Sequence, residues 1–430
     1  MSISKNPFSL AKILIVLFLS MAVSNFAQNI KEARKTIDKL CSKDFSGRGY
    51  SNNGDKSAAL FLTEKLKKFK LLPFESGFEQ DFDISVNTFP GAMKLSLNDS
   101  PLIPGYDYIV SATSNSVSGD FPVIIMDQNL VDYPEKLKKI SKEKLQQSFL
   151  LIDTTNIKNK GFKDAISDII NGNLFGAKGI IEIEHKNLLY TPSSVQQTFP
   201  RIKILRDAIP ENLKTISLTI NNQYYSNYTT RNIAAFIPGE IDSFIVFSSH
   251  YDHLGLMGKD VFFPGANDNA SGVAMVLDLA EYYQKNQKNL KYSMAFLFFS
   301  AEEMGLLGSR YYTSNPLFPL SKIKFLVNLD MVGSGDKGIK VVNGTQFKDE
   351  FDKLVEFNKA KNYLAEVSIR GPAANSDHFP FYDKGVKSFF IYTLGEYSEY
   401  HSIFDKPDGL PLIEYEDLYR LLVDFVGSFN

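Results

Sequence analysis

The sequence predicts an α/β protein with two parts: a mostly parallel central sheet covered by helices on both faces, and a smaller β-rich α/β module inserted into it. Two observations carry this prediction. Within residues 232–430, strand candidates alternate with helix candidates, and several strands are continuous apolar runs. Strands that are apolar on both sides are typical of a sheet buried under two helical layers. Residues 96–228 instead contain short β-type runs between loops rich in Asn, Ser and Lys, which indicates a separate module.

The N-terminal segment, residues 1–27, is predicted to be a secretory signal peptide. Lys5 and Lys12 precede the apolar run 13–23, and small or polar residues lead to Ala27. The apolar run is too short for a membrane span. We therefore expect a secreted or periplasmic protein with no stable membrane association after cleavage; an uncleaved anchor is the alternative.

The composition excludes some classes of partner. The 430 residues carry 47 Lys and Arg against 49 Asp and Glu, a formal net charge of −2. Proteins that bind nucleic acids or anionic membranes usually carry an excess of basic residues. This chain has no such excess, so neither partner is expected. Cys41 is the only cysteine, so no internal disulfide can form. Stability must then come from the core and from any bound metal.

Residues 28–95 are predicted to be the N-terminal part of the main domain, with amphipathic helices over 30–40 and 56–69. The inserted module, 96–228, is predicted to contain one helix over 162–175, closed by Gly176. It has no cluster of His, Cys or paired carboxylates, so we expect a binding, gating or structural role. Its predicted strands are 123–126, 149–152, 179–183 and 216–220.

The main domain, 229–430, begins its regular alternation of strands and helices at Asn232. Gly427 closes its last helix, as glycine often does. The predicted strands are 233–236, 244–247, 294–299, 325–329, 338–342 and 387–392, and the predicted helices are 272–284, 305–313, 348–359 and 415–426.

Polar side chains stand where these strands end. Those that follow a predicted strand, or lie in the loop after it, are His250, Glu302, Glu303, Asp330 and His401. In open α/β sheets, ligands gather outside the carboxyl ends of the strands, so these residues converge if the strands are parallel. Asp268 stands where the next helix begins and can turn an oxygen toward the same point. His253 and His378 are expected to form local hydrogen bonds or to support ligands, not to bind metal.

Two imidazoles with several carboxylates suit zinc better than magnesium, which prefers oxygen ligands and keeps its waters. Adjacent Glu302 and Glu303 can have separate roles, one as a ligand and one as a general base. Three alternatives stand beside this interpretation: a solvated acidic pair at a helix start, a satisfied turn histidine at His250, and a simple helix N-cap at Asp268. The apolar strand directly before the glutamates weakens the first alternative.

Six motifs in this order resemble those of the secreted di-zinc aminopeptidases, a metallopeptidase family that also includes glutamate-carboxypeptidase-type and transferrin-receptor-type ectodomains. The motifs are HYDHLG, PGANDNASG, FFSAEEMGLLGS, NLDMVG, NSDHFPF and EYHSIFDKPD. The match covers residues 232–430, and DFSGRGYSNNGDKSA (44–58) is similar to the family's entry motif. Within the insert, LFGAKGIIEIE (174–184) and TFPRIKI (198–204) resemble a protease-associated domain.

This resemblance implies a zinc-exopeptidase fold that binds two Zn²⁺ ions. His250 and Asp330 would hold one ion, Glu303 and His401 would hold the other, and Asp268 would bridge the two.

The resemblance also implies roles for three residues that hold no metal. Glu302 would be the general base, Asp252 would orient His250, and Tyr400 would stabilise the oxyanion. In this family the peptide bond after the bridging aspartate is cis, so the Asp268–Asn269 bond is predicted to be cis.

The sequence therefore predicts a zinc-dependent aminopeptidase that releases N-terminal residues of peptides or small amides through a zinc-bridging water. Two alternatives stay open. One is a single-zinc glutaminyl cyclase on the same scaffold, against which the full set of five ligands argues. The other is a non-catalytic receptor-type binding protein, against which the intact Glu302 argues. The insert either narrows access to the site or is a separately folded ornament.

Overall fold

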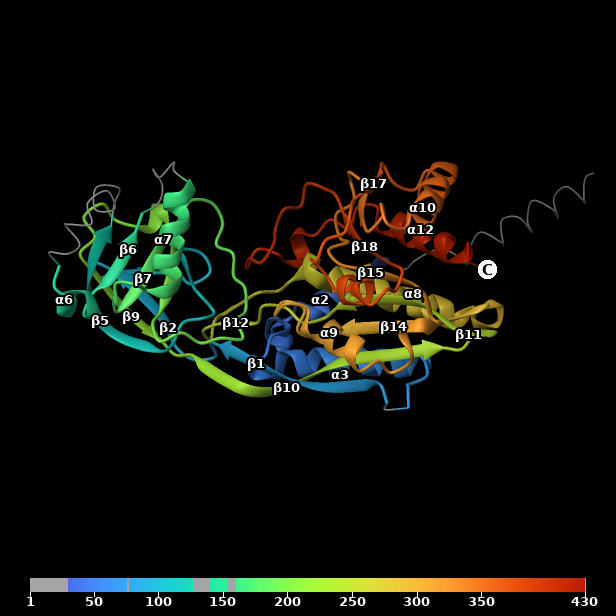
Figure 1. Ribbon diagram of the computed structural model, residues 1–430, viewed down its shortest axis with the longest axis horizontal. Coiled ribbons are helices and arrows are strands. Elements are labelled where there is room, and N and C mark those ends of the chain that lie inside the picture. Colours follow the sequence, from blue (N-terminus) through green and yellow to red (C-terminus); the bar gives the residue numbers. More distant parts are fainter. Residues whose placement is uncertain (1–29, 76, 127–139, 154–159, 430) are drawn as a thin grey trace, which may run out of the picture.

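The computed structural model describes residues 30–75, 77–126, 140–153 and 160–429. The predicted signal peptide, residues 1–27, lies outside these described residues. Two eight-stranded sheets organise the chain and follow one another along the long axis of the molecule (Figure 1). In the described part of the chain, no helix is both long enough and apolar enough to cross a membrane.

The larger sheet has a parallel centre and antiparallel flanks. Its strand order is β1 (Glu79–Thr88), β10 (Gln223–Ile237), β14 (Tyr292–Phe299), β11 (Ile241–His250), β15 (Ile323–Leu329), β18 (Ser388–Thr393), β16 (Ile339–Val342) and β17 (Val367–Ile369). The four central strands, β14 to β18, run parallel, whereas β10 and β16 pair antiparallel with them from either side. The predicted fold class is confirmed.

Helices bury both faces of the larger sheet. They are α2 (Ile30–Leu40), α3 (Gly54–Phe69), α8 (Gly272–Lys285), α9 (Leu307–Ser314), α10 (Lys348–Lys361), α11 (His378–Asp383) and α12 (Tyr415–Gly427). On β14, Phe296 packs in the core shared with α2, α3, α8 and α12, whereas the next residue, Leu297, packs with Tyr312 of α9 and Phe381 of α11. Successive residues of a strand point to opposite faces, so a strand between two helical layers must be apolar throughout.

The smaller sheet forms the inserted module. Its strand order is β3 (Ser100–Leu102), β2 (Met93–Leu97), β9 (Thr215–Ile220), β5 (Val117–Met126), β6 (Phe149–Ile152), β7 (Gly179–Glu184), β8 (Arg201–Leu205) and β4 (Tyr108–Val110). The helices α6 (Lys142–Gln146) and α7 (Lys160–Gly172) accompany it. Phe149 and Leu150 of β6 belong to two separate buried clusters, so this sheet also has a core on each face.

Two long strands connect the sheets. β1 leads from the larger sheet into the insert and β10 returns, and the two pair antiparallel from Glu79 opposite Ile233 to Thr88 opposite Gln223. β10 is therefore much longer than the predicted strand 233–236, and it runs through the predicted domain boundary at 228/229. The sequence analysis predicted no strand over residues 79–88, where the structure has β1.

Most of the predicted helices differ from the observed ones at one end or both, and two of these ends have a clear backbone cause. The helix predicted over 162–175 ends at Gly172, because Asn173 adopts a left-handed φ of 45° and its side chain bonds to the backbone of Ala177. A left-handed residue commonly terminates a helix. The helix predicted from residue 305 begins at Leu307, since Leu306 also has a left-handed φ, of 62°.

The insert contacts the main domain beside the strand-end loops. The ring of Tyr190, from the insert, stacks on Phe263 with centroids 5.0 Å apart. The Tyr190 N–H also donates to the carbonyl of His401 at 3.1 Å. At a second point, Tyr106 meets Phe404 edge to face at 5.4 Å. The insert thus touches the loop that carries one of the candidate metal ligands.

Candidate metal centre

The parallel strands bring the predicted site residues to one edge of the larger sheet. His250 is the last residue of β11, Glu302 and Glu303 follow β14, and Asp330 follows β15. Together with Asp268 they line one cavity of about 260 Å³. The complete lining is His250, Asp268, Glu302, Glu303, Asp330, Met331, Asn375, Phe390, Tyr392, Tyr400 and His401.

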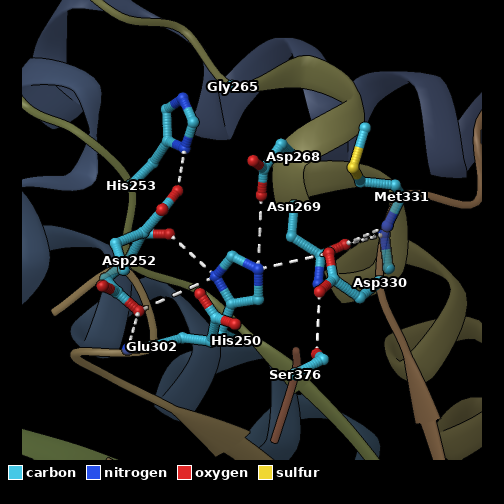
Figure 2. A network of polar contacts seen from close by, with 12 residues as sticks. His250, Asp252, His253, Gly265, Asp268, Asn269, Glu302, Asp330, Met331 and Ser376 are labelled. Carbon is cyan, nitrogen blue, oxygen red and sulfur yellow. Dashed lines mark hydrogen bonds and ion pairs between the residues drawn. The ribbon is translucent and has the colours of Figure 1, made fainter. Parts of the chain in front are cut away.

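The carboxylate of Asp268 lies between two clusters of nitrogen and oxygen atoms. In the first, His250 Nε2 is 3.3 Å from Asp268 Oδ1 and 3.3 Å from Asp330 Oδ1 (Figure 2). In the second, His401 Nε2 is 3.3 Å from Asp268 Oδ2 and 2.9 Å from Glu303 Oε2. Each oxygen of Asp268 therefore faces a different histidine, which is the arrangement that a bridging ligand requires.

The composition of this site fits divalent metal ions. The carboxylates of Glu303 and Asp268 raise the pKa of His401 to about 11, although burial acts in the opposite direction. Burial also lowers the pKa of His250, but Glu302 and Asp330 outweigh it and hold that pKa well above its usual range. A buried site this negative favours a cation, and imidazole with carboxylate is a typical donor set for zinc.

The third histidine near the cavity, His253, supports a candidate ligand. Its Nδ1 is 2.8 Å from Glu303 Oε1, while the other oxygen of Glu303 faces His401. His253 is buried and does not line the cavity. His253 also lies close enough to Glu303 and Asp268 for the three to form a metal-binding group. Because His401 faces the cavity and His253 stands behind Glu303, we regard His253 as a supporting residue, as the sequence predicts.

Asp252 lies behind His250, at its other ring nitrogen. His250 Nδ1 is 3.2 Å from the Asp252 carbonyl and 3.8 Å from its Oδ1 (Figure 2). The carboxylate of Asp252 also accepts from the Glu302 N–H at 3.1 Å and from the Tyr50 hydroxyl at 3.1 Å. Burial is the main reason that the pKa of Asp252 is raised to about 7. Asp252 thus contacts both the backbone N–H of Glu302 and the Nδ1 atom of His250.

Glu302 and Tyr400 also line the cavity, and Glu302 lies close enough to His250 and Asp330 for the three to form a metal-binding group. Burial, with the nearby charges of Asp330 and Glu303, raises the pKa of Glu302 well above its usual range, despite the opposing effect of His250. Tyr400 stacks on His401, with ring centroids 3.8 Å apart. Burial and the surrounding carboxylates raise the pKa of Tyr400, so its hydroxyl stays protonated and can donate a hydrogen bond.

Some residues of the site escaped the sequence analysis. The Ser376 hydroxyl donates to Asp330 Oδ2 at 2.8 Å (Figure 2), and the side chain of Asn269 donates to the carbonyl of Leu329. Ser376 lies in the quoted motif NSDHFPF, which was the available signal. The Asp268–Asn269 peptide bond is cis, as predicted.

His378, the fourth histidine near the strand ends, is buried on α11 and does not line the cavity. Burial lowers its pKa to about 3, so the ring is neutral. It has no place in either cluster.

Comparison with known proteins shows that the chain is similar to peptidases. The model of peptidase family M28 matches residues 232–426. Aminopeptidase YwaD of Bacillus subtilis is 25% identical over 414 residues, which cover 91% of this chain and 82% of that protein. Leupeptin-inactivating enzyme 1 of Streptomyces exfoliatus is 29% identical over 213 residues, 48% of this chain. The chain spans only 45% of the length of that second relative.

Solved structures share the fold over nearly the whole chain. BSAP, a zinc aminopeptidase from Bacillus subtilis, superposes with a TM-score of 0.68 at 20% identity and covers 94% of this chain and 95% of its own. The aminopeptidase from Aneurinibacillus sp. strain AM-1 gives 0.61 at 20% identity, covering 94% and 93%. The residues that match the model of peptidase family M28, 232–426, contain every candidate ligand.

Proposed function

We propose that this protein is a zinc-dependent aminopeptidase that releases N-terminal residues from peptides. The observation that carries the proposal is the carboxylate of Asp268, which turns one oxygen toward His250 and the other toward His401. The names of the relatives and the match to the model of peptidase family M28 support the same reaction class.

In this proposal the site would hold two zinc ions, and Asp268 would be a ligand of both. His250 and Asp330 complete the first site, and Glu303 and His401 complete the second. When bound, the ions supply an activated water and polarise the carbonyl of the peptide. The set of five ligands supports two ions rather than the single zinc of a cyclase.

The protein's own residues hold and move the proton. Glu302 projects into the cavity, where it accepts the proton of the attacking water and returns it to the leaving amine. Burial and the neighbouring carboxylates raise the pKa of Glu302, and a raised pKa makes a carboxylate a stronger proton acceptor. Tyr400 donates its hydroxyl proton to the carbonyl oxygen as negative charge develops there. Asp252 keeps His250 in orientation.

The cavity is small. Its volume of about 260 Å³ is below the usual range for drug-sized ligands, roughly 300–1,000 Å³. Met331, Phe390 and Tyr392 line it, so an apolar side chain fits.

We further propose that residues 1–27 are a signal peptide and that the mature protein acts outside the cytoplasm, secreted or periplasmic. Residues 28–95 and 229–430 would form the peptidase domain, and residues 96–228 a protease-associated-like domain. The two separate sheets support a division into two domains, although β2 and β10 cross the predicted limits at 95/96 and 228/229.

The decisive experiment uses metal-replete protein and a panel of aminoacyl p-nitroanilides, each with a matched N-acetylated version. We expect p-nitroaniline to be released from the substrates with a free amino group and not from the N-acetylated ones. Glu302→Gln should lose this activity. Cyclisation of an N-terminal Gln peptide without hydrolysis would support the cyclase instead. Protein that retains two zinc ions but cleaves no substrate would support a binding role.

A further inference from the structure

The entry motif at residues 44–58 has no part in the proposed chemistry, yet it contains Arg48, a completely buried arginine. No carboxylate lies within ion-pair distance of Arg48 among the residues that the structure describes. Burying a cation without a paired anion is costly unless its donors are all satisfied. The position of Arg48 therefore requires an explanation.

The five N–H groups of Arg48 meet five backbone carbonyls. Nε donates to Tyr251 at 2.9 Å and Nη1 to Leu40 at 3.3 Å. The other three carbonyls belong to the turn that carries Asp268: Nη1 donates to Pro264 at 2.6 Å, and Nη2 donates to Gly265 at 2.8 Å and to Asp268 at 3.1 Å. A guanidinium has five donors in a rigid fork, and here every one is used.

The amide groups of the same turn meet a buried anion, Asp405. The Asn267 N–H donates to both oxygens of Asp405, at 2.9 and 3.1 Å, and the Asp268 N–H donates to Oδ2 at 3.0 Å. The Tyr397 hydroxyl donates to Oδ1 at 2.8 Å. Asp405 is fully buried and does not line the cavity. The turn is therefore held by a cation at its carbonyls and by an anion at its amides.

The turn is tightly packed at Gly265. Gly265 has a left-handed φ of 63°, and a Cβ there would stand 2.5 Å from Arg48 Nη2 and 2.2 Å from the Asp268 carbonyl. Figure 2 shows Gly265 and Asp268 on one turn beside His250. Only glycine allows Arg48 to approach the turn so closely.

We propose that Arg48 and Asp405 are positioning residues for Asp268: together they fix the turn 264–268 so that Asp268 presents one oxygen to each zinc site. The inference rests on the proposed two-zinc function. We call Arg48 and Asp405 together the clamp. The two residues lie near opposite ends of the sequence, so the clamp also joins the entry motif to the last metal-binding loop. Residues that hold a ligand in place commonly contribute 10–100-fold to metal affinity.

The test measures zinc binding and does not depend on catalysis. Zinc affinity is determined by competition with a chromophoric chelator for the full chain and for Arg48→Lys, Arg48→Met and Asp405→Asn. The control is Arg34→Met. Arg34 also donates to two backbone carbonyls, those of Pro407 and Leu410. Thermal unfolding in EDTA reports the stability of each apo-protein separately.

We expect Asp405→Asn and Arg48→Met to lose roughly 10–100-fold in zinc affinity, and Arg34→Met to bind zinc like the unmodified protein. Arg48→Lys keeps the charge but not the fork, so it should fold and still bind zinc weakly. The visible spectrum of the Co²⁺ form should change in these clamp variants and not in the control.

Unaltered zinc affinity in both Arg48→Lys and Asp405→Asn would overturn the proposal, and these two variants decide it even if Arg48→Met does not fold. Affinity restored by lysine alone would show that only the charge matters, and would also overturn it. Failure of the proposed function looks different: the unmodified protein would bind two zinc ions and cleave no peptide, while the clamp variants still lost affinity.

Discussion

Replacing each of the two adjacent glutamates by glutamine separates the roles proposed for them. In the described part of the chain, the Glu302 carboxylate has no hydrogen bond to a protein group. Its backbone is engaged instead: the N–H donates to Asp252, and the carbonyl accepts from the N–H groups of Gly305 and Leu306. Both oxygens of Glu303 are engaged, by His253 at 2.8 Å and by His401 at 2.9 Å. The same substitution therefore meets two different environments.

Glu302→Gln should abolish proton transfer and leave the metal in place. General-base catalysis contributes about 10²–10⁴-fold, so kcat should fall by that factor, or about 3–5 kcal/mol of transition-state stabilisation. Zinc content should stay at the unmodified level, because the amide fills the same space and no contact with a protein group is lost.

Glu303→Gln should lose metal. Gln can offer an oxygen to only one of its two imidazole neighbours and must turn its NH₂ group toward the other. A charge-assisted hydrogen bond is worth about 1.5–3 kcal/mol, equivalent to roughly 10–100-fold in zinc affinity.

Both variants are measured by zinc content after dialysis, by kcat at saturating zinc, and by thermal unfolding. Excess zinc should restore part of the activity of Glu303→Gln and none of that of Glu302→Gln. Equal loss of zinc in the two variants, or recovery of Glu302→Gln by added zinc, would refute the assignment.

Three further predictions concern stability and access. Removing zinc with a chelator should lower Tm by about 10 °C. Two sites, each with free zinc at about 1,000 times its Kd, contribute about 8 kcal/mol, and a chain of this length unfolds with an entropy of roughly 0.8 kcal/mol/K. An unchanged Tm in scanning calorimetry would contradict bound zinc. Burial lowers the pKa of His378 to about 3, so only the unfolded state binds this proton between about pH 6.5 and pH 3, and stability falls as pH decreases through that window. His378→Phe, measured in EDTA, should flatten the decline, and an equal decline would contradict it. Tyr106→Ala removes the partly exposed insert ring that meets Phe404, and it should change kcat/KM for longer peptides relative to an aminoacyl anilide; equal changes for both substrates would argue against gating.

The positions of the ligand candidates could be predicted because they obey a local rule. Each of His250, Glu303 and Asp330 stands at or just beyond the end of an apolar strand, and parallel strands bring such ends together. The apolar runs themselves predicted the two helical layers. These signals lie within a few residues of the side chains concerned, so a single sequence suffices to detect them.

The supports of the ligands could not be predicted in this way. Arg48 contacts the Asp268 turn across a separation of 220 residues, and Tyr50 reaches Asp252 across 202. Nothing in the residues around position 48 indicates which carbonyls will satisfy a buried arginine. The pairing of β1 with β10 has the same character, because each strand is recognisable only beside the other. Asn173 shows a smaller limit: its left-handed conformation ends a helix that Gly176 seemed to close.

The insert also supports the site through contacts between distant parts of the sequence, and a test of its role must keep these contacts intact. Both of its ends continue into strands of the catalytic sheet, β1 and β10, and Tyr190 donates a hydrogen bond to the carbonyl of His401. Excision of the insert would therefore remove a backbone partner of a proposed zinc ligand together with any barrier to substrate, and loss of activity would have two explanations. The ring of Tyr106 contacts Phe404, which is not a candidate ligand, so substitution there changes the rim of the cavity while the Tyr190 hydrogen bond stays in place. If the zinc content of Tyr106→Ala is unchanged, any shift in peptide-length preference then reports access alone.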